Sequence, residues 1–161
     1  FGVCLAHGWG VEKNDSKAVQ LFRAAAEQGF PNAEYNMGVR YSTGHGVPHD
    51  DHQAFQWFER AAKQGHAKAQ SNLGVCFVNG KGCEKDDAIA IEWYTLAAKN
   101  KDPVALFNLG EIYETGDKGV DRDLDAAVEF YKSASFQGVE RADERLEALG
   151  VAIPIKGAAQ H

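Results

Sequence analysis

Apolar and small residues recur along the chain at the spacing of an α-helix. Ala33, Met37 and Tyr41 follow one another at steps of four, which places them on one face of a helix. A second apolar stripe follows a glycine-containing turn, with offsets of three, four, seven and eight from its first residue: Ala54, Trp57, Phe58, Ala61 and Ala62. The pattern predicts a pair of amphipathic helices, which we call the A helix and the B helix of the pair.

This helix pair is repeated along the chain. Glycines return every 36 residues in two registers, Gly2, Gly38, Gly74 and Gly110 in the first and Gly8, Gly44, Gly80 and Gly116 in the second. Alanines follow the same interval at Ala33, Ala69 and Ala105, and one residue later at Ala142. Self-similarity at a fixed period of this length indicates stacked structural repeats, because no single pair can bury its apolar face alone.

Polar residues, proline and glycine mark the ends of the predicted helices. One register carries side chains that can accept hydrogen bonds from the first free amides of the B helices, namely Asn14, Asp50, Asp86 and Asp123. Pro31 and Pro103 suit the first position of the A helices, where a missing amide hydrogen does no harm. Gly44 and its equivalents suit the left-handed residue that ends each A helix.

Another glycine register, Gly38, Gly74 and Gly110, falls inside the predicted A helices. Glycine within a helix costs about 0.5–1 kcal/mol relative to alanine, so a structural reason is needed. We expect the B helix to approach the A helix closely at these positions.

The recurring residues carry a family resemblance. In the second repeat they form the run Ala33-x3-Met37-Gly38-x2-Tyr41-x2-Gly44-x-Gly46-Val47-x2-Asp50-x3-Ala54-x2-Trp57-Phe58-x2-Ala61-Ala62-x2-Gly65. This run closely resembles the Sel-1-like repeat, a relative of the tetratricopeptide repeat, and the similarity extends over about 1–149. The resemblance implies an all-α fold, a right-handed α-solenoid of about four helix-turn-helix repeats of 36–37 residues with a C-terminal capping helix.

We therefore expect one repeat domain over 1–149 and a tail over 150–161. The predicted parts of the domain are a partial first repeat at 1–32, full repeats at 33–68, 69–104 and 105–141, and a capping helix at 142–149. Three positions depart from the pattern: Cys83 stands in a valine register, Lys101 replaces the turn glycine, and one residue is inserted between Gly116 and Gly119. The inserted loop fits either a recognition feature or a tolerated surface insertion, of which the second is favoured.

The charge balance narrows the expected partners. The 161 residues include 17 Lys plus Arg and 23 Asp plus Glu, a net charge of −6. Nucleic acid is not an expected partner, because phosphate binding needs a basic face, and no direct membrane span is expected, because no stretch of 18 apolar residues occurs. The chain opens at Phe1 with no signal-peptide pattern, so we expect a segment of a longer protein, and the sequence indicates no compartment.

Candidate reactive residues do not combine into a predicted active or metal site. His45, His49 and His52 fall within eight residues, but the next repeat has Lys81 and Lys85 at two of the matching positions, so a solvated loop is favoured over a zinc site. The paired glycines follow helices and precede no Lys-Ser/Thr signature, so they are structural turns rather than phosphate loops. We expect no enzyme activity, no catalytic residues, no cofactor and no metal.

The three cysteines give no predicted disulfide. Cys4 and Cys76 occupy one register two repeats apart, too far for the Cα spacing of a disulfide. Cys76 meets Cys83 only if the intervening loop folds back. The redox state of all three is left open by the sequence.

The predicted binding surface lies on the A helices. In tetratricopeptide-type solenoids these helices line the concave side, so the resemblance implies that their non-core residues face the groove. The residues are Tyr35, Asn36 and Val39 in the second repeat, Ser71, Asn72 and Val75 in the third, and Phe107, Asn108 and Glu111 in the fourth. Large aromatic residues outside the repeat pattern are typical interface anchors, which singles out Tyr35 and Phe107. The asparagines form a ladder that either clamps a peptide backbone or braces the neighbouring repeat.

The expected function is that of a protein–protein interaction scaffold or adaptor. It would bind a partner protein or peptide, or a multiprotein complex, in the concave groove. The alternative is a non-catalytic structural subunit that docks through its ends or its convex face. The partner itself is not predicted, because a repeat fold fixes the form of a surface and not its ligand.

Overall fold

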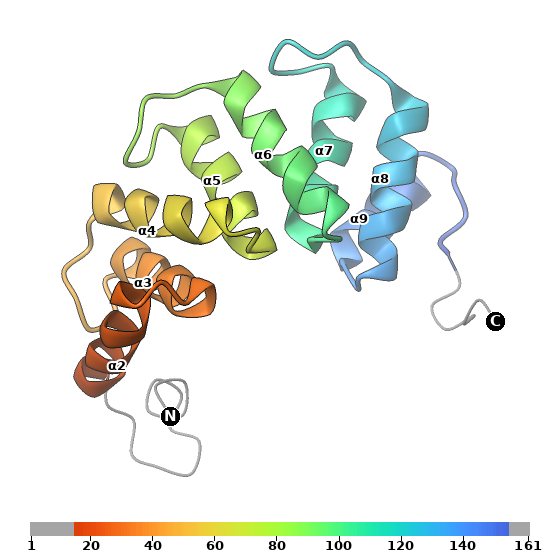
Figure 1. Cartoon of the computed structure of the whole chain (residues 1–161). Coiled ribbons are helices and arrows are strands. Elements are labelled where there is room, and N and C mark those ends of the chain that lie inside the picture. The colour runs from red at the N-terminus through yellow and green to blue at the C-terminus, as the bar shows by residue number, and fades with distance from the viewer. Residues whose placement is uncertain (1–14, 155–161) are drawn as a thin grey trace. The chain divides into compact units, whose positions relative to one another are not determined.

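The computed structural model describes residues 15–154. These residues form eight α-helices and no strand: α2 (Asp15–Glu27), α3 (Pro31–Thr43), α4 (Asp51–Lys63), α5 (Ala67–Asn79), α6 (Asp87–Lys99), α7 (Pro103–Thr115), α8 (Leu124–Phe136) and α9 (Glu140–Ala148) (Figure 1). The A helices are α3, α5, α7 and α9, and the B helices are α2, α4, α6 and α8. Asn14, Cys4, Gly2 and Gly8 lie outside the described residues.

The chain divides into two compact units, Phe1–Asp86 and Asp87–His161. In the first unit α2 packs on α3, α3 on α4 and α4 on α5, and in the second α6 packs on α7, α7 on α8 and α8 on α9. One core of unit 1 is built from Ala18, Val19, Phe22, Ala26, Ala33 and Met37. One core of unit 2 is built from Leu106, Phe107, Ala127, Tyr131, Ala134, Ala142 and Leu146. Each unit therefore holds apolar residues contributed by successive A and B helices.

The helix ends follow from the residues predicted to make them. Asp50 accepts a hydrogen bond from the Gln53 amide at 3.0 Å, and Asp123 accepts one from the Ala126 amide at 2.9 Å, so two of the four predicted N-caps are confirmed. Left-handed glycines end three of the A helices, α3 at Gly44 (φ 70°), α5 at Gly80 (φ 67°) and α7 at Gly116 (φ 70°), whereas α9 ends at Leu149 with φ −86°. The prolines begin α3 and α7 as predicted.

Two glycines inside A helices meet the rings of B helices. A Cβ atom at Gly38 would lie 2.5 Å from the Phe58 ring, and one at Gly110 would lie 2.5 Å from the Tyr131 ring. These distances are far below van der Waals contact, so only glycine lets the two helices approach this closely. The expected close approach is confirmed at both positions.

The loop after each of two A helices contacts the start of the preceding B helix. In unit 1, Gly82 passes so close to Asp51 that a Cβ atom would lie 2.1 Å from the Asp51 carbonyl oxygen. In unit 2, the equivalent loop holds the inserted residue, and Lys118 Nζ lies 3.5 Å from the carboxylate of Asp87, which has the register of Asp51. The insertion thus has a structural role, because it carries a lysine that binds the loop to α6.

Candidate functional site

Three predicted surface residues lie on α3, and all are half-buried. The Tyr35 ring stacks on His66 with 4.6 Å between ring centroids and lies 5.9 Å from the Phe58 ring. The Asn36 amide donates to the Asn32 carbonyl at 2.7 Å, within its own helix. Tyr35 is therefore held against α4 and the start of α5, and it presents only part of its ring to solvent.

Two predicted residues of α5 line a hollow in unit 1. Asn72 and Val75 are half-buried, and the hollow has a volume of about 190 Å³. It is lined by Ser42 of α3, Asp51, Ala54 and Phe58 of α4, Asn72, Val75 and Cys76 of α5, and Lys81. The third predicted residue of this helix, Ser71, is only 2% exposed and is not part of the lining.

The hollow combines an apolar floor with a polar rim. Ala54, Phe58 and Cys76 are buried, whereas Asp51 and Lys81 bring opposite charges to the edge. Burial, with smaller contributions from Cys83 and Asp51, raises the pKa of the Cys76 thiol to about 12. Cys76 is therefore a neutral thiol at physiological pH and contributes packing rather than a nucleophile.

On α7 the predicted aromatic anchor is part of the core. Phe107 is 4% exposed, because the Tyr131 ring lies 5.6 Å away and the Arg141 guanidinium covers its face at 4.4 Å. A side chain covered on both sides has little surface to offer a partner, and this corrects the expectation that Phe107 faces an open groove. Asn108 and Glu111 are half-buried, and Glu111 forms a 3.4 Å ion pair with Arg141.

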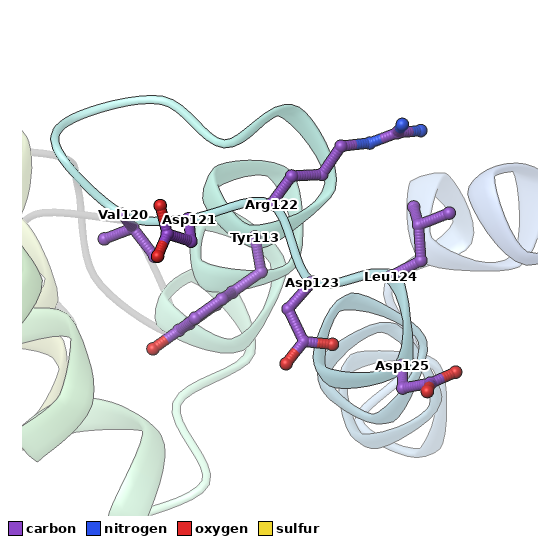
Figure 2. A pocket seen from close by; sticks show the side chains of 7 residues that line it. All are labelled: Tyr113, Val120, Asp121, Arg122, Asp123, Leu124 and Asp125. Atoms are coloured by element: carbon purple, nitrogen blue, oxygen red, sulfur yellow. The ribbon is translucent and has the colours of Figure 1, made fainter.

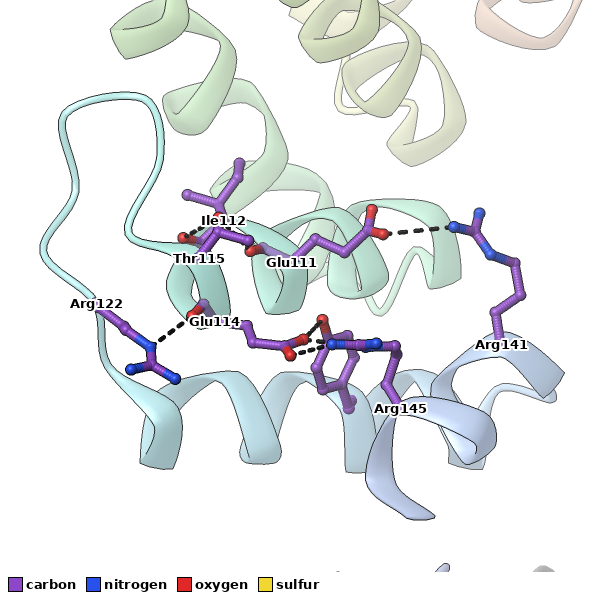
Figure 3. A network of polar contacts seen from close by, with 8 residues as sticks. Glu111, Ile112, Glu114, Thr115, Arg122, Arg141 and Arg145 are labelled. Atoms are coloured by element: carbon purple, nitrogen blue, oxygen red, sulfur yellow. Dashed lines mark hydrogen bonds and ion pairs between the residues drawn. The ribbon is translucent and has the colours of Figure 1, made fainter. Parts of the chain in front are cut away.

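A polar network joins α7, α8 and α9 next to Phe107. Glu114 accepts hydrogen bonds from Arg145, whose Nε lies 3.1 Å away, and from the Tyr131 hydroxyl at 2.7 Å (Figure 3). Burial opposes ionisation of Glu114, but these hydrogen bonds and the charges of Arg145 and Arg122 outweigh it, so the pKa of the carboxyl is lowered. The carboxylate is thus charged and fully engaged inside the protein.

The hollow and the network occupy equivalent places in the repeat. Glu114 has the register of Ser42, Tyr131 that of Phe58, and Arg145 that of Asn72. In unit 1, the small polar residues Ser42 and Asn72 leave the space between the A helices α3 and α5 open. In unit 2 a glutamate and an arginine fill it with an ion pair. The A-helix surface is therefore open in unit 1 and closed between α7 and α9.

Comparison with protein families decides the identity of the repeat. The model of the Sel1 repeat matches four segments of the sequence, residues 2–30, 31–66, 67–102 and 103–139. This chain belongs to the Sel1 repeat family. The matched segments begin two residues before the starts of our predicted full repeats, and our division of the chain into repeats, cap and tail stays a prediction.

Solved structures give the same fold. A Sel1 repeat protein from Oxalobacter formigenes is 34% identical over 92% of the chain with a TM-score of 0.85, and a protective antigen of uropathogenic Escherichia coli that displays an SLR fold is 36% identical over 94% with a TM-score of 0.83. Cysteine rich protein B of Helicobacter pylori is 26% identical over 83% of the chain, with a TM-score of 0.65, and the match covers 96% of that protein. Among curated proteins, no relative matches the sequence.

The Sel1 repeat chain is shorter than its more similar relatives. It spans 62% of the Oxalobacter protein and 33% of the E. coli antigen. The predicted all-α helical-repeat fold class is confirmed by these structures and by the described helices. Sel1 repeat proteins generally mediate protein–protein interactions, and the family is generally a non-catalytic scaffold.

A second hollow of the Sel1 repeat chain lies beside the inserted loop. It has a volume of about 550 Å³ and is lined by Tyr113, Val120, Asp121, Arg122, Asp123, Leu124 and Asp125. Figure 2 shows the Arg122 guanidinium pointing away from the Tyr113 ring. Arg122 Nε donates to the Glu114 carbonyl at 3.0 Å, and Asp123 is already used as the N-cap of α8. Arg122 and Asp123 thus have local structural roles.

The histidine-rich loop also has local partners. His49 lies 3.2 Å from the Asp51 carboxylate, and His52 hydrogen-bonds the Gly82 carbonyl at 3.2 Å and the Gln56 amide at 3.0 Å. Over residues 15–154, no three His, Cys, Asp or Glu side chains gather as metal ligands. No helix in that range is long and apolar enough to cross a membrane.

Proposed function

We propose that this Sel1 repeat chain is a protein-interaction module, without catalytic activity of its own, that binds a partner protein or peptide on the A-helix surface of unit 1. The hollow lined by Asn72 and Val75 carries the proposal, because it lies at positions predicted from the repeat pattern to face a ligand. Tyr35, Asn36 and Val39 on α3 extend this surface. In unit 2, Asn108 and Glu111 form a smaller polar surface, and neither Ser71 nor Phe107 has enough exposed area to contribute.

The chemistry of the hollow suits a peptide of mixed polarity. The Asn72 carboxamide can both donate to and accept from a peptide backbone. The apolar floor of the hollow, made by Ala54 and Phe58, accommodates a small apolar side chain of the peptide. Asp51 and Lys81 at the rim favour polar residues on either side of it. Because all of the lining residues except Lys81 belong to packed helices, binding needs little ordering of the protein.

The direct test closes the hollow with residues that the protein already uses in unit 2. In Ser42→Glu/Asn72→Arg, the pair Glu114–Arg145 is copied to the equivalent positions of unit 1. The control, Ser16→Glu/Gln20→Arg, makes the same chemical changes at exposed positions of α2. Wild type and both variants are compared by affinity capture from native extract with mass spectrometry, after thermal unfolding has confirmed equal stability.

We expect a stoichiometric partner to be lost from the closed variant and kept by the control. If the closed variant retains every partner of the wild type, the proposal is wrong. The chain would then be better described by the alternative, a structural subunit that docks through its ends or another face.

A further inference from the structure

A different surface of unit 2 is open and apolar where unit 1 is sealed. In unit 1, the space between the B helices α2 and α4 is filled by Arg60. Its Nε lies 3.0 Å from the Glu34 carboxylate, one Nη donates to the Ala26 carbonyl at 3.2 Å, and the guanidinium stacks on Trp57 at 4.5 Å. Gln64 adds a 2.6 Å hydrogen bond to the same carboxylate.

The equivalent residues of unit 2 cannot form this seal. Leu106 has the register of Glu34, Ser133 that of Arg60, and Phe130 that of Trp57. Ser133 is too short to span the gap and donates instead to the Glu129 carbonyl of its own helix at 2.9 Å. Within the described part of the chain, no long, charged side chain therefore fills the space between α6 and α8. Helix α7 lies between these two helices (Figure 1).

The result is a groove made of two adjoining hollows of about 450 and 550 Å³. The two share Ala98, Lys99, Leu106 and Ser133. Leu106 and Leu109 of α7 form the floor, Ala126 and Phe130 belong to the α8 wall, and Phe136, which is 59% exposed, stands at the end of that wall. An apolar groove of this size flanked by polar residues is typical of a protein-binding surface.

The charges at the groove are basic, although the chain as a whole has a net charge of −6. Lys99 and Lys101 line the α6 side, and within residues 15–154 neither takes part in an ion pair. The acidic residue of the lining, Glu129, is already paired with Lys132 at 2.8 Å. The nearby Asp102 carboxylate accepts from the Ala105 amide at 2.9 Å and is 4% exposed, so it does not offset the lysines at the surface.

The walls also indicate the conformation of a ligand. They are helices, whose backbone groups are already hydrogen-bonded, so an extended peptide would find no strand edge to pair with. A helical ligand satisfies its own backbone and needs only apolar side chains on one face. We propose that the groove between α6 and α8 binds an acidic amphipathic helix of a partner protein, with the apolar face on Leu106, Leu109 and Phe130 and the carboxylates beside Lys99 and Lys101.

The test uses three synthetic peptides of equal length. The first carries leucines at helical i, i+3, i+4, i+7 spacing and glutamates elsewhere, the second replaces the glutamates by lysines, and the third interrupts the acidic helix with prolines. Binding to the whole chain is measured by fluorescence anisotropy, and amide chemical shifts map the contact. We expect the acidic helix to bind with a Kd below about 100 μM and to shift residues of α6, α7 and α8, and the other two to bind at least about tenfold more weakly.

Two variants and a control locate the site. Leu106→Glu/Ser133→Arg copies the seal of unit 1 and should abolish binding of the acidic helix. Because a buried glutamate is a risk to folding, Lys99→Glu/Lys101→Glu changes only exposed side chains and should weaken binding about tenfold. The control Lys63→Glu makes the same charge reversal in the register of Lys99 and should leave binding unchanged.

Several outcomes overturn the proposal. They are no binding of the acidic helix up to about 1 mM, equal binding of the basic or proline-containing peptide, and unchanged affinity in Lys99→Glu/Lys101→Glu. Concentration-dependent dimerisation that the Leu106→Glu/Ser133→Arg variant removes would also overturn it, because the occupant would then be a second copy of the chain. None of these results bears on the hollow of unit 1, so this inference and the proposed function fail separately.

Discussion

At the scale of single residues, a left-handed backbone is unfavourable for a residue other than glycine, and Lys101 adopts it. Lys101 has φ 58° at the end of a B helix, a position at which the other described repeats use Gly29, Gly65 and Gly138. A left-handed conformation costs a residue with a Cβ atom roughly 1–2 kcal/mol, whereas glycine adopts it freely. The departure at Lys101 that the sequence shows is therefore a departure in side chain only, since the backbone keeps the conformation of the family's turn.

Replacing this lysine should stabilise the protein. We expect Lys101→Gly to raise the free energy of unfolding by about 0.5–1 kcal/mol, because the strain is removed while part of the gain is offset by the larger freedom of glycine in the unfolded chain. Urea denaturation followed by circular dichroism measures it. The reverse change Gly65→Lys, at a position with φ 86° and no atom within 4 Å of an added Cβ, should destabilise by a similar amount. Equal stability of all three proteins would contradict this account.

Replacing the glycines beneath aromatic rings should destabilise the protein for a different reason, which is steric overlap with the ring. We expect Gly38→Ala to destabilise by about 1–3 kcal/mol, since the new methyl group would overlap the Phe58 ring. In a Phe58→Leu background the same change should cost less, and a double-mutant cycle measures the difference. Strict additivity of the two substitutions would show that the ring is not the obstacle.

At the scale of helices, pairs of charged side chains decide which gaps between helices are filled. Glu34–Arg60 fills the gap between α2 and α4, and Glu114–Arg145 fills the one between α7 and α9. The equivalent residues Leu106–Ser133 and Ser42–Asn72 leave hollows instead. The helices keep the same lengths in both cases, since α2 to α8 each have 13 residues.

Removing only Arg60 from the Glu34–Arg60 pair should lower the free energy of unfolding more than replacing both residues. Arg60→Ser leaves the carboxylate of Glu34, which is 1% exposed, without its cation, and we expect a loss of about 2–4 kcal/mol. Glu34→Leu/Arg60→Ser, which copies Leu106 and Ser133 of unit 2, should recover most of this loss because no buried charge remains. Thermal and chemical unfolding of the two variants compare them. A double variant no more stable than Arg60→Ser would mean that the ion pair itself holds α3 to α4.

The second pair predicts a pH dependence. The pKa of Glu114 is lowered in the folded protein, so its ionised form contributes stability that is fully present above the unfolded pKa of about 4.3 and is lost as the pH falls through the lower folded pKa. We expect Glu114→Gln to be less stable than wild type by about 1–3 kcal/mol at pH 7. The difference should shrink as the pH falls below about 4. Urea titrations at several pH values measure it, and a constant difference from pH 7 to pH 3 would contradict the assignment.

The helices themselves were predictable because their pattern is local. Periodic alanines, caps at Asp50 and Asp123, and glycines at Gly44 and Gly116 each act within a few residues of their own position. Whether a surface is open or covered was not predictable from a local pattern. Whether Phe107 is covered depends on Arg141 and Tyr131, which come from two other helices. The closing role of Arg145 could have been suspected from its register with Asn72 and Asn108, but its partner Glu114 is apparent only in the folded protein.

At the scale of the whole molecule, the chain is two compact units whose described helices contact mainly their neighbours in sequence. In such a protein, stability is close to a sum of local terms, and a weakened contact lowers protection nearby first. The repeat period predicted this serial arrangement. It did not predict the division at Asp86, because every repeat has nearly the same pattern of apolar positions.

Local destabilisation should therefore stay local. Glu114→Gln weakens the contact between α7 and α9, and we expect faster amide exchange in α7, α8 and α9 with little change in α3 and α4. Native-state hydrogen exchange with mass spectrometry measures both regions in one sample. An equal loss of protection throughout residues 15–154 would show that the two units unfold as one.

The pairs that seal or open these gaps have a consequence for engineering. The side chains at positions 34, 60, 106 and 133 and at 42, 72, 114 and 145 differ between equivalent sites, while helix lengths and the two aspartate caps of α4 and α8 stay the same. A combinatorial library restricted to these eight codons would redistribute cavities over an otherwise constant backbone. Selection from it would yield binders with different specificities from one parent, without redesign of any helix, turn or cap.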